Sequence, residues 1–311
     1  MLISSKLARC FSYRRLTMLP RHLFIIFCLF NLLFLLPKAY AQINFKQLSQ
    51  FAKLSSDTYI ETLTKSELGD TLKQQGQQLI HQAVLPNSDV LYFLSQNKQA
   101  QTLAIRGTAN LNNVILDLTV SLQFDQALGV QLHTGFAQAA QQVLQDVRPY
   151  LDKDIPLAIT GHSLGGAIAV VLAMYLEAEG HPIESVVTFG QPKVTNLSGA
   201  KKFADMPLLR IVTEQDIVPL VPPISPLQIQ NLDIFWHMGK EIILLGKHQF
   251  SVTSGIKSAL RATKFSNQLP SEANLRAHQI SRYIILLDAL STKEEEVPYR
   301  MEINLFGISI D

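Results

Sequence analysis

Apolar residues along the chain follow two kinds of pattern, and the two kinds alternate. Residues 45–63 carry apolar side chains at helical spacing and are predicted to form a helix. Helices of the same kind are predicted over 135–151, 164–179 and 275–290. Short apolar runs bounded by turn-like residues predict strands over 89–96, 101–107, 155–160, 183–190, 208–216 and 240–246. This alternation indicates an α/β protein with a mostly parallel central sheet and helices on both faces.

One stretch interrupts this pattern with residues of little bulk. The predicted strand 155–160 leads into Gly161-His162-Ser163-Leu164-Gly165, and an apolar helix follows at once. A G-x-S-x-G sequence between a strand and a helix is typical of a nucleophile elbow, in which a sharp turn exposes the serine hydroxyl. The bare pattern also fits a plain glycine-rich turn, but the strand before it and the helix after it favour the elbow. We therefore predict that Ser163 is a nucleophile and that the backbone N–H of Leu164 donates to an oxyanion.

The first 41 residues differ from the rest of the chain. They contain six basic residues and no acidic one, with a 14-residue apolar run over 23–36 followed by Ala39-Tyr40-Ala41. These features predict a secretory signal over 1–41 that is cleaved after Ala41, and a secreted or periplasmic protein. An uncleaved membrane anchor is the alternative, but a spanning helix needs about 20 apolar residues and this run also contains Asn31.

The amino-acid composition limits the number of domains, the use of cysteine and the kinds of partner. The 311 residues are 47% apolar, which is enough for one large domain, predicted over 42–290. Both cysteines, Cys10 and Cys28, would leave with the signal, so neither a disulfide nor a cysteine–metal site is expected. The full chain has a net charge of +2, and loss of the six basic residues would leave −4. A mildly acidic protein is a poor nucleic-acid binder.

Five stretches in a fixed order resemble the class 3 lipases, the family of the filamentous-fungal triacylglycerol lipases. They cover 104–118, 130–136, 159–167, 187–196 and 214–223, and 235–244 is a weaker sixth match. The resemblance spans roughly residues 45–290 and implies the α/β-hydrolase fold with a short helical lid. It gives no guidance for the tail 291–311, where the charged run 291–300 is expected to be a solvated linker and the alternating residues beyond it could add an edge strand.

The segment after Arg106-Gly107 carries two further expectations. The resemblance implies that Thr108 donates its backbone N–H and its hydroxyl to the oxyanion. Apolar residues at helical spacing then form one stripe on a short helix, at Leu111, Val114, Ile115 and Leu118. In the family this segment is the lid, which covers the serine in water and opens at a lipid surface. A helix packed in the core is the alternative interpretation.

A serine nucleophile needs a base, and the base needs a carboxylate that orients it. Asp216 ends the predicted strand 208–216 and stands at the acid position of the resembling family, while Glu214 is the local alternative. In this fold the residues occur in the order serine, acid, histidine. Three histidines follow Asp216, namely His237, His248 and His278.

The resemblance implies that the base is His278, at the head of the last predicted helix. His248 is the alternative, and His237 matches a structural position of the family. The family often has an aspartate before the base and a tyrosine three residues after it, whereas this chain has Ala277 and Ser281 there, with Tyr283 two residues later. The resemblance also implies structural roles for His162, beside the nucleophile, and for His133.

Together these features predict a secreted serine hydrolase that cleaves carboxylic ester bonds of acyl lipids through a Ser-His-Asp triad and an acyl-enzyme. This chemistry needs no cofactor and no metal. The expected partner is a lipid substrate at a membrane or emulsion interface, with no nucleic acid and no protein partner implied. A phospholipase A or galactolipase would use the same site, an acyltransferase would differ only in its acceptor, and an inactive lipase-like scaffold would bind lipid or a partner without turnover.

Overall fold

The computed structural model describes residues 42–60, 64–86, 90–107, 122–222, 228, 234–255, 258, 271–299, 303–305 and 308–310. The chain divides into two units, Met1–Ile43 and Asn44–Asp311, and the fold reported below is that of the second unit. The predicted secretory signal over 1–41 lies outside the described residues, as do Thr108 and the predicted lid helix. Within the described part, no helix has the length and apolar character needed to cross a bilayer.

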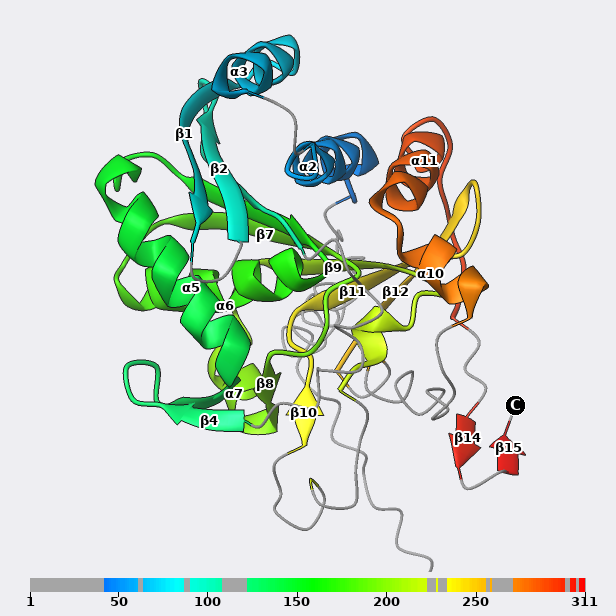
Figure 1. Ribbon diagram of the computed structural model, residues 1–311. Helices are drawn as coiled ribbons and strands as arrows, with labels where there is room; N and C mark the ends of the chain where they lie inside the picture. The colour runs from blue at the N-terminus through cyan, green and yellow to red at the C-terminus, as the bar shows by residue number, and fades with distance from the viewer. Residues whose placement is uncertain are drawn as a thin grey trace, which may run out of the picture. The chain divides into compact units, whose positions relative to one another are not determined.

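A mixed β-sheet forms the centre of the second unit (Figure 1). Among the described residues its strands are β1 (Gln78–Leu85), β2 (Val90–Gln96), β3 (Gln101–Ile105), β6 (Leu157–His162), β7 (Ile183–Phe189), β9 (Leu208–Thr213), β11 (Lys240–Leu244), β12 (Gln249–Ser254) and β13 (Glu295–Glu296), in that spatial order. The strands from β3 to β11 run parallel, while β1, β2 and β12 add antiparallel pairs at the two sides. The carboxyl ends of the parallel strands therefore share one edge, where ligands bind in open α/β sheets.

Helices cover both faces of this sheet. On one face lie α5 (Thr134–Val147) and α6 (Leu164–Ala178), and on the other lie α2 (Phe45–Asp57) and α11 (Ile280–Leu290) (Figure 1). Successive side chains of a strand point to opposite faces. In β6, Ile159 belongs to the apolar cluster with α5 and α6, while Oγ1 of Thr160 lies 2.9 Å from Oγ of Ser55 in α2.

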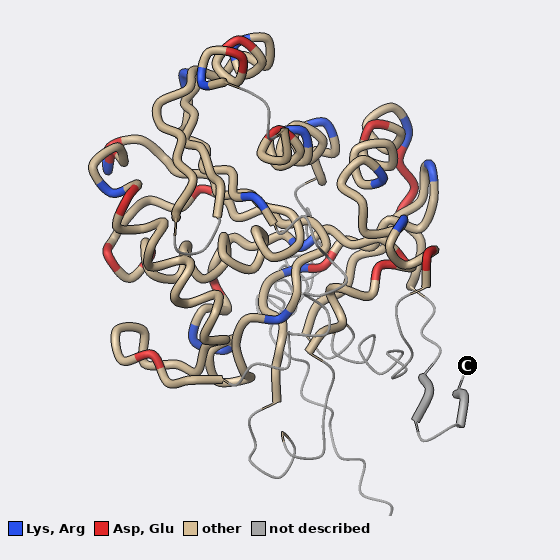
Figure 2. The backbone as a smooth tube through the Cα atoms, viewed as in Figure 1, with Lys and Arg blue, Asp and Glu red and all other residues tan. Residues whose placement is uncertain are grey.

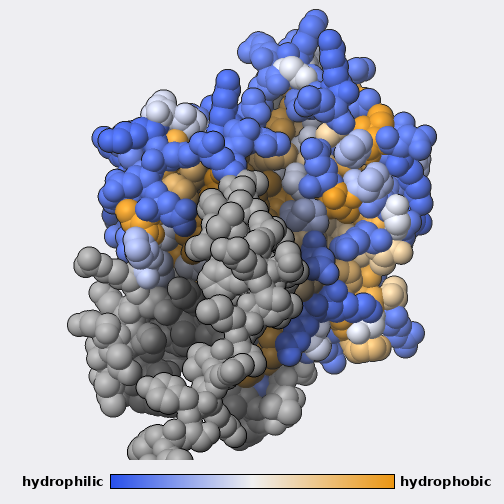
Figure 3. Space-filling model, turned by 180° about the vertical axis from the view of Figure 1, so that it is seen from behind, coloured by the Kyte–Doolittle hydropathy of each residue, from blue (hydrophilic) through white to orange (hydrophobic). Residues whose placement is uncertain are grey.

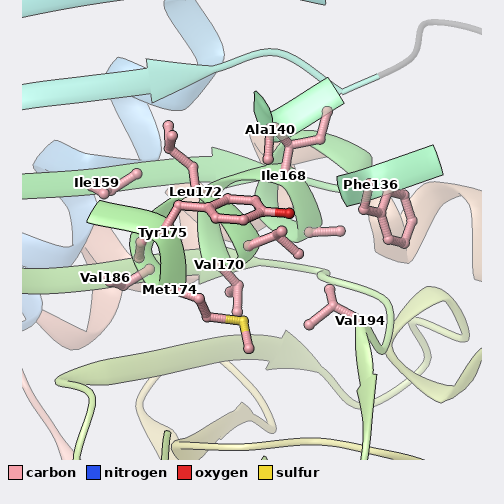
Figure 4. Packing of buried hydrophobic residues seen from close by; sticks show 14 of the residues in the cluster. Phe136, Ala140, Ile159, Ile168, Val170, Leu172, Met174, Tyr175, Val186 and Val194 are labelled. Carbon is pink, nitrogen blue, oxygen red and sulfur yellow. The ribbon is translucent and has the colours of Figure 1, made fainter. Parts of the chain in front are cut away.

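The main apolar cluster surrounds α6, which is buried at every residue from Gly165 to Leu176. A helix that is apolar all round belongs in the interior, because it has no polar face to present to water. Figure 4 shows Ile168, Leu172 and Tyr175 of this helix packed between Ile159 of β6 and Ala140 of α5. Both elements that flank Ser163 are therefore held rigidly by the core.

The smaller elements complete the fold. A second sheet has the order β10 (Phe235–Trp236), β8 (Thr195–Asn196), β5 (Val130–His133) and β4 (Leu122–Asp125). The remaining described helices are α3 (Lys65–Gln74), α7 (Leu197–Lys202), α10 (Glu272–His278) and the short 3-10 turns Arg148–Tyr150 and Val218–Leu220. The edge strand β13 comes from the charged run that was expected to be a linker, while β14 (Ile303–Leu305) and β15 (Ile308–Ile310) pair only with each other.

Most of the charged residues that the structure describes lie outside the central strands. Lysine, arginine, aspartate and glutamate concentrate on the helices and loops in Figure 2, and the central strands are nearly free of them. On the coloured part of the opposite face, hydrophilic residues predominate and hydrophobic patches lie between them (Figure 3). One exception in the interior is Arg210 of β9, which is buried and lies 3.2 Å from Glu241 of β11. This ion pair links the neighbouring strands β9 and β11.

Several predicted elements have different limits in the structure. The first helix ends at Asp57, well short of residue 63, so Tyr59 lies in the turn that follows it. The last predicted helix is two helices, because Gln279 adopts an extended conformation (φ −60°, ψ 132°) between α10 and α11. The strands β1 and β12 of the central sheet and the short strands of the second sheet were not predicted, because they lack a continuous apolar run.

Candidate active site

Ser163 lies in a strained turn between β6 and α6. Its backbone has φ 58° and ψ −130°, and it is the one non-glycine residue with positive φ among those the structure describes. A Cβ at Gly161 would overlap the carbonyl oxygen of Gly165, so the turn closes only because glycine occupies this position. Strain of this kind persists only where the surrounding structure enforces it, and it clusters at active sites.

Leu164 begins α6, and the first turn of a helix has backbone N–H groups without an intrahelical acceptor. A Cβ at Gly165 would overlap the carbonyl oxygen of Ile105, which means that the start of α6 packs directly against the end of β3. The segment Arg106-Gly107, which precedes Thr108, therefore lies beside Ser163. Thr108 itself, like Leu111, Val114, Ile115 and Leu118, is outside the described residues, so its role stays a prediction.

Asp216 follows the carboxyl end of β9 and is fully buried. Its Oδ2 accepts hydrogen bonds from Nδ1 of His278 at 2.8 Å and from Oη of Tyr283 at 2.5 Å, while Oδ1 accepts from the backbone N–H of Val218 at 2.9 Å. Burial alone would raise the pKa of this carboxyl, but the charge and hydrogen bond of His278, with the other two donors, hold the pKa below its usual value. The carboxylate is therefore ionised near neutral pH.

His278 is the last residue of α10, and only 3% of its surface is exposed. The carboxylate of Asp216 accepts from Nδ1, so the proton of the neutral imidazole lies on Nδ1 and Nε2 keeps its lone pair. Within the described part of the molecule, Nε2 of His278 and Oγ of Ser163 are buried polar atoms that have no hydrogen-bond partner. The imidazole therefore has a free ring nitrogen, which is what a general base requires.

The other candidates from the sequence lie elsewhere. His248 is exposed in the hairpin between β11 and β12, where its Nδ1 is 3.3 Å from the carbonyl oxygen of Lys293. Glu214 is exposed on the strand-end loop. His237 donates from Nε2 to the carbonyl oxygen of Pro219 at 2.6 Å, and His133 caps the start of α5. None of these four side chains has a hydrogen bond to Asp216 among the contacts that the described residues make.

Two tyrosines at the site were not assigned a role from the sequence. Tyr283, which donates to Asp216, stands two residues beyond the spacing of the family's tyrosine and was noted only as a departure from it. Tyr59 lies 2.8 Å from Nδ1 of His162, but the sequence placed it inside a longer helix. Its proximity to Ser163 depends on tertiary packing, so no local pattern could have revealed it.

The site has no feature of a metal centre in the part of the chain that the structure describes. No group of three or more histidine, cysteine, aspartate or glutamate side chains converges there in a way that could hold a metal ion. The groups that do converge are a strained serine, a histidine, and an ionised carboxylate bound to that histidine. This combination suits proton transfer and nucleophilic attack.

Comparison with known proteins identifies the relatives of this chain. Residues 102–225 match the model of the family described as Lipase (class 3). The chain is 27% identical over 195 residues to the lipase of Rhizomucor miehei, covering 57% of this chain and 54% of that protein. It is 30% identical over 150 residues to the secreted mono- and diacylglycerol lipase 1 of Fusarium solani, covering 43% of each. The chain thus spans about half the length of these curated relatives.

Solved structures show the same relationship at the level of the fold. The chain superposes with a TM-score of 0.53 on a triacylglycerol lipase whose catalytic centre is described as a serine protease triad, at 25% identity, covering 65% of this chain and 80% of that one. The α/β-hydrolase fold and the family resemblance that the sequence predicted are both confirmed. The match of residues 102–225, the relatives and the fold all show that the chain is similar to the class 3 lipases.

Proposed function

We propose that this protein hydrolyses carboxylic ester bonds of acyl lipids, with Ser163 as the nucleophile. The observation that carries the proposal is the pair of buried, unpartnered polar atoms, Oγ of Ser163 and Nε2 of His278. Leaving such an atom without a partner costs about 1–3 kcal/mol. Other buried atoms, such as Oγ of Ser185, also lack a partner, but Ser163 has a strained backbone and His278 is bound to an ionised carboxylate. Catalytic hydrogen bonds are often loose without substrate and tighten when the reacting complex forms.

The mechanism follows from the orientation of these groups. Nε2 of His278 takes the proton of Ser163 as Oγ attacks the acyl carbonyl, and returns it to the leaving alcohol. Asp216 fixes the tautomer and stabilises the imidazolium, since its carboxylate accepts from Nδ1 and remains ionised. The N–H of Leu164 supports the oxyanion, together with Thr108 as the expected second donor. Water then cleaves the acyl-enzyme and regenerates the serine.

The relatives support a lipid as the acyl donor and an extracellular site of action. One relative is named a lipase and another a secreted mono- and diacylglycerol lipase, and the apolar run 23–36 with Ala39-Tyr40-Ala41 is the sequence feature that fits export. N-terminal sequencing of protein recovered from the medium or periplasm should begin at Gln42. A recovered chain that still contains residues 23–36 would contradict cleavage.

The nucleophile is tested with a matched pair of serine variants. Ser163→Ala should lower kcat on a soluble p-nitrophenyl ester by at least about a thousandfold and abolish labelling by a fluorophosphonate probe. Ser185→Ala is the control, because Oγ of Ser185 is also buried without a partner but lies on β7. That variant should keep wild-type activity and labelling. Full labelling of Ser163→Ala would mean that another serine does the chemistry.

The substrate class is tested by assaying wild-type protein on a short soluble ester, a triglyceride emulsion, phosphatidylcholine and a galactolipid. A lipase should cleave the emulsion fastest per mole of ester presented. Preference for phosphatidylcholine or the galactolipid would reassign the headgroup while leaving the site unchanged. Lipid binding without turnover of any of the four esters would instead identify an inactive scaffold.

A further inference from the structure

A continuous set of hydrogen bonds joins the end of β3 to the backbone of the base. The backbone of Gly107 hydrogen-bonds the hydroxyl of Tyr59. The same hydroxyl lies 2.8 Å from Nδ1 of His162, and Nε2 of His162 lies 2.7 Å from the carbonyl oxygen of His278. We call these residues, Gly107, Tyr59, His162 and the main chain of His278, the tyrosine–histidine relay. Its contacts differ from those that hold the imidazole of His278 to Asp216.

The direction of each hydrogen bond in the relay is fixed by chemistry. A carbonyl oxygen only accepts, so Nε2 of His162 carries a proton and donates to His278. Burial, and next the charge of His278, lower the pKa of His162 to about 3, so the ring is neutral near pH 7 and Nδ1 keeps a lone pair. Burial also raises the pKa of the Tyr59 hydroxyl, which therefore keeps its proton and donates to Nδ1.

The relay provides a hydrogen-bond donor for the carbonyl group of His278, which has no donor within its own helix. His278 ends α10, and the last four carbonyls of a helix lack intrahelical partners. Gln279 is extended and ends the helix, so α10 supplies no backbone N–H that could donate to the carbonyl of His278. The donor comes instead from His162, the residue directly before Ser163. The main chain of the base is thereby fixed to the turn that holds the nucleophile.

The same contacts reach the strand that leads toward Thr108. A Cβ at Gly107 would stand 2.5 Å from Oη of Tyr59 and 2.6 Å from the carbonyl oxygen of His162, so these groups meet in close contact. Tyr59 therefore touches both the end of β3 and the residue beside the nucleophile. A side chain in the turn after α2, far from Ser163 in sequence, links the two segments that surround the reacting serine.

We propose that Tyr59 is a positioning residue that acts through His162 to fix the main chain of His278 and to keep His162 uncharged during the reaction. The proposal rests on the proposed function, because it concerns the base of the same site. The rings of His162 and His278 have centroids 4.5 Å apart. A positive charge on His162 would oppose the protonation of His278 when Ser163 attacks, since like charges at this distance disfavour each other. A neutral neighbour leaves His278 as the group that gains the proton.

The first test compares Tyr59→Phe with Tyr175→Phe. Tyr175 is a matched control, because its hydroxyl also donates to one side chain, Asp125, and accepts from another, Gln141, neither of which belongs to the site. With a soluble short-chain ester, Tyr59→Phe should lower kcat about tenfold with KM nearly unchanged, while Tyr175→Phe keeps wild-type kcat. Equal kcat values for the two variants would overturn the proposal.

The pH profile supplies a readout that a purely structural role would not change. Without the hydroxyl of Tyr59, Nδ1 of His162 is no longer occupied by a donor, so this ring can take up a proton more easily. On the acid side of the profile, log kcat of Tyr59→Phe should then fall with a slope of about two per pH unit, because two protons are taken up, whereas the wild type should fall with a slope of about one. An acid side with the wild-type slope would contradict a role of Tyr59 in keeping His162 neutral.

A rescue experiment tests the two hydrogen bonds of His162. Glutamine has an amide N–H that can donate to the carbonyl of His278 and an oxygen that can accept from Tyr59, and it cannot be protonated near neutral pH. His162→Gln should therefore keep at least about ten times the kcat of His162→Leu, which offers neither hydrogen bond. Equal loss in both variants would show that the relay does not act through these bonds.

An independent measurement separates the relay from the proposed function. ¹⁵N NMR of histidine-labelled wild-type protein should show His162 as the neutral tautomer with its proton on Nε2 from about pH 5 to pH 8. A cation or the opposite tautomer in that range would overturn the relay, whatever the assays show. Absence of ester cleavage by the wild type, with the expected tautomer present, would instead refute the proposed function alone.

Discussion

Gly190 lies so close to Asp216 that a Cβ built at position 190 would stand 2.7 Å from Oδ2 of the carboxylate. The same Cβ would lie 2.8 Å from Cε1 and Nδ1 of His278. Gly190 also has a φ of +59°, a conformation that other residues rarely adopt. The residue directly after β7 is therefore part of the wall against which the carboxylate and the imidazole pack.

Replacement of this glycine should damage stability and catalysis together. Gly190→Ala should lower the free energy of unfolding by about 1–3 kcal/mol beyond the backbone cost and reduce kcat by about a hundredfold, because the new methyl group displaces the Asp216–His278 pair. Urea denaturation and assay of a soluble ester measure the two effects.

A second glycine provides the control for backbone strain. Gly180 has a φ of +78°, but no atom lies within 4 Å of the place that a Cβ would take there. Gly180→Ala should cost about 1 kcal/mol of stability and leave kcat unchanged. If both variants lose kcat equally, the close packing at Gly190 has no special importance for the site.

The hydroxyl of Tyr283 should matter for catalysis and not only for stability. Tyr283→Phe removes a donor from the buried carboxylate of Asp216, which should cost about 1.5–3 kcal/mol of unfolding free energy. We expect kcat to fall about tenfold, because the carboxylate then orients His278 less firmly. Tyr92→Phe is the control, since Tyr92 is equally buried and donates to Asp146 of α5, which has no part in the site. That variant should lose stability and keep kcat.

The assignment of the base is open to a direct comparison of two histidines. His278→Ala should lower kcat at least about a thousandfold, as Ser163→Ala does, because members of a triad act as a unit. His248→Ala should keep most activity, since this side chain is exposed and contacts the backbone of Lys293. The reverse outcome would require the C-terminal third of the fold to rearrange around Asp216.

Acid should destabilise the protein through its buried histidines. The folded pKa of His162 is about 3, against 6.5 as the ordinary value, so between these pH values the unfolded chain binds a proton that the folded chain does not. Stability therefore falls as pH drops through this window, by about 1.4 kcal/mol per pH unit for one proton. His133, with a pKa lowered by burial to about 4, adds a contribution of the same sign down to its own pKa.

One substitution tests whether His162 causes the loss of stability at acid pH. His162→Gln should reduce the slope of unfolding free energy against pH by about one proton between roughly pH 4 and pH 6. Asp216 acts at lower pH: its folded pKa lies below its usual value, so its contribution is present above 3.8 and is lost as pH falls through the folded pKa. Chemical denaturation at several pH values measures both slopes.

The sequence predicted the elements that surround Ser163 because their signals are local and strong. The buried strand β6 and the mostly buried helix α6 leave long apolar runs, and glycine is required on both sides of the serine turn. The break at Gln279 could not be predicted, since neither glycine nor proline marks it. Tyr59 was missed for a different reason, because a turn after one helix reaches the site only through the packing of α2 on the sheet.

The packing of α2 against α11 also bears on how the chain folds. Oγ of Ser49 and Nζ of Lys53 in α2 both contact Oδ1 of Asp288 in α11, which joins residues more than two hundred positions apart. Contacts of such long range slow folding, because a large loop must close before they form. A nascent chain emerges amino terminus first and cannot make them until α11 has been synthesised. His278 lies just before α11, so its contact with Asp216 can form only after this part of the chain has been synthesised.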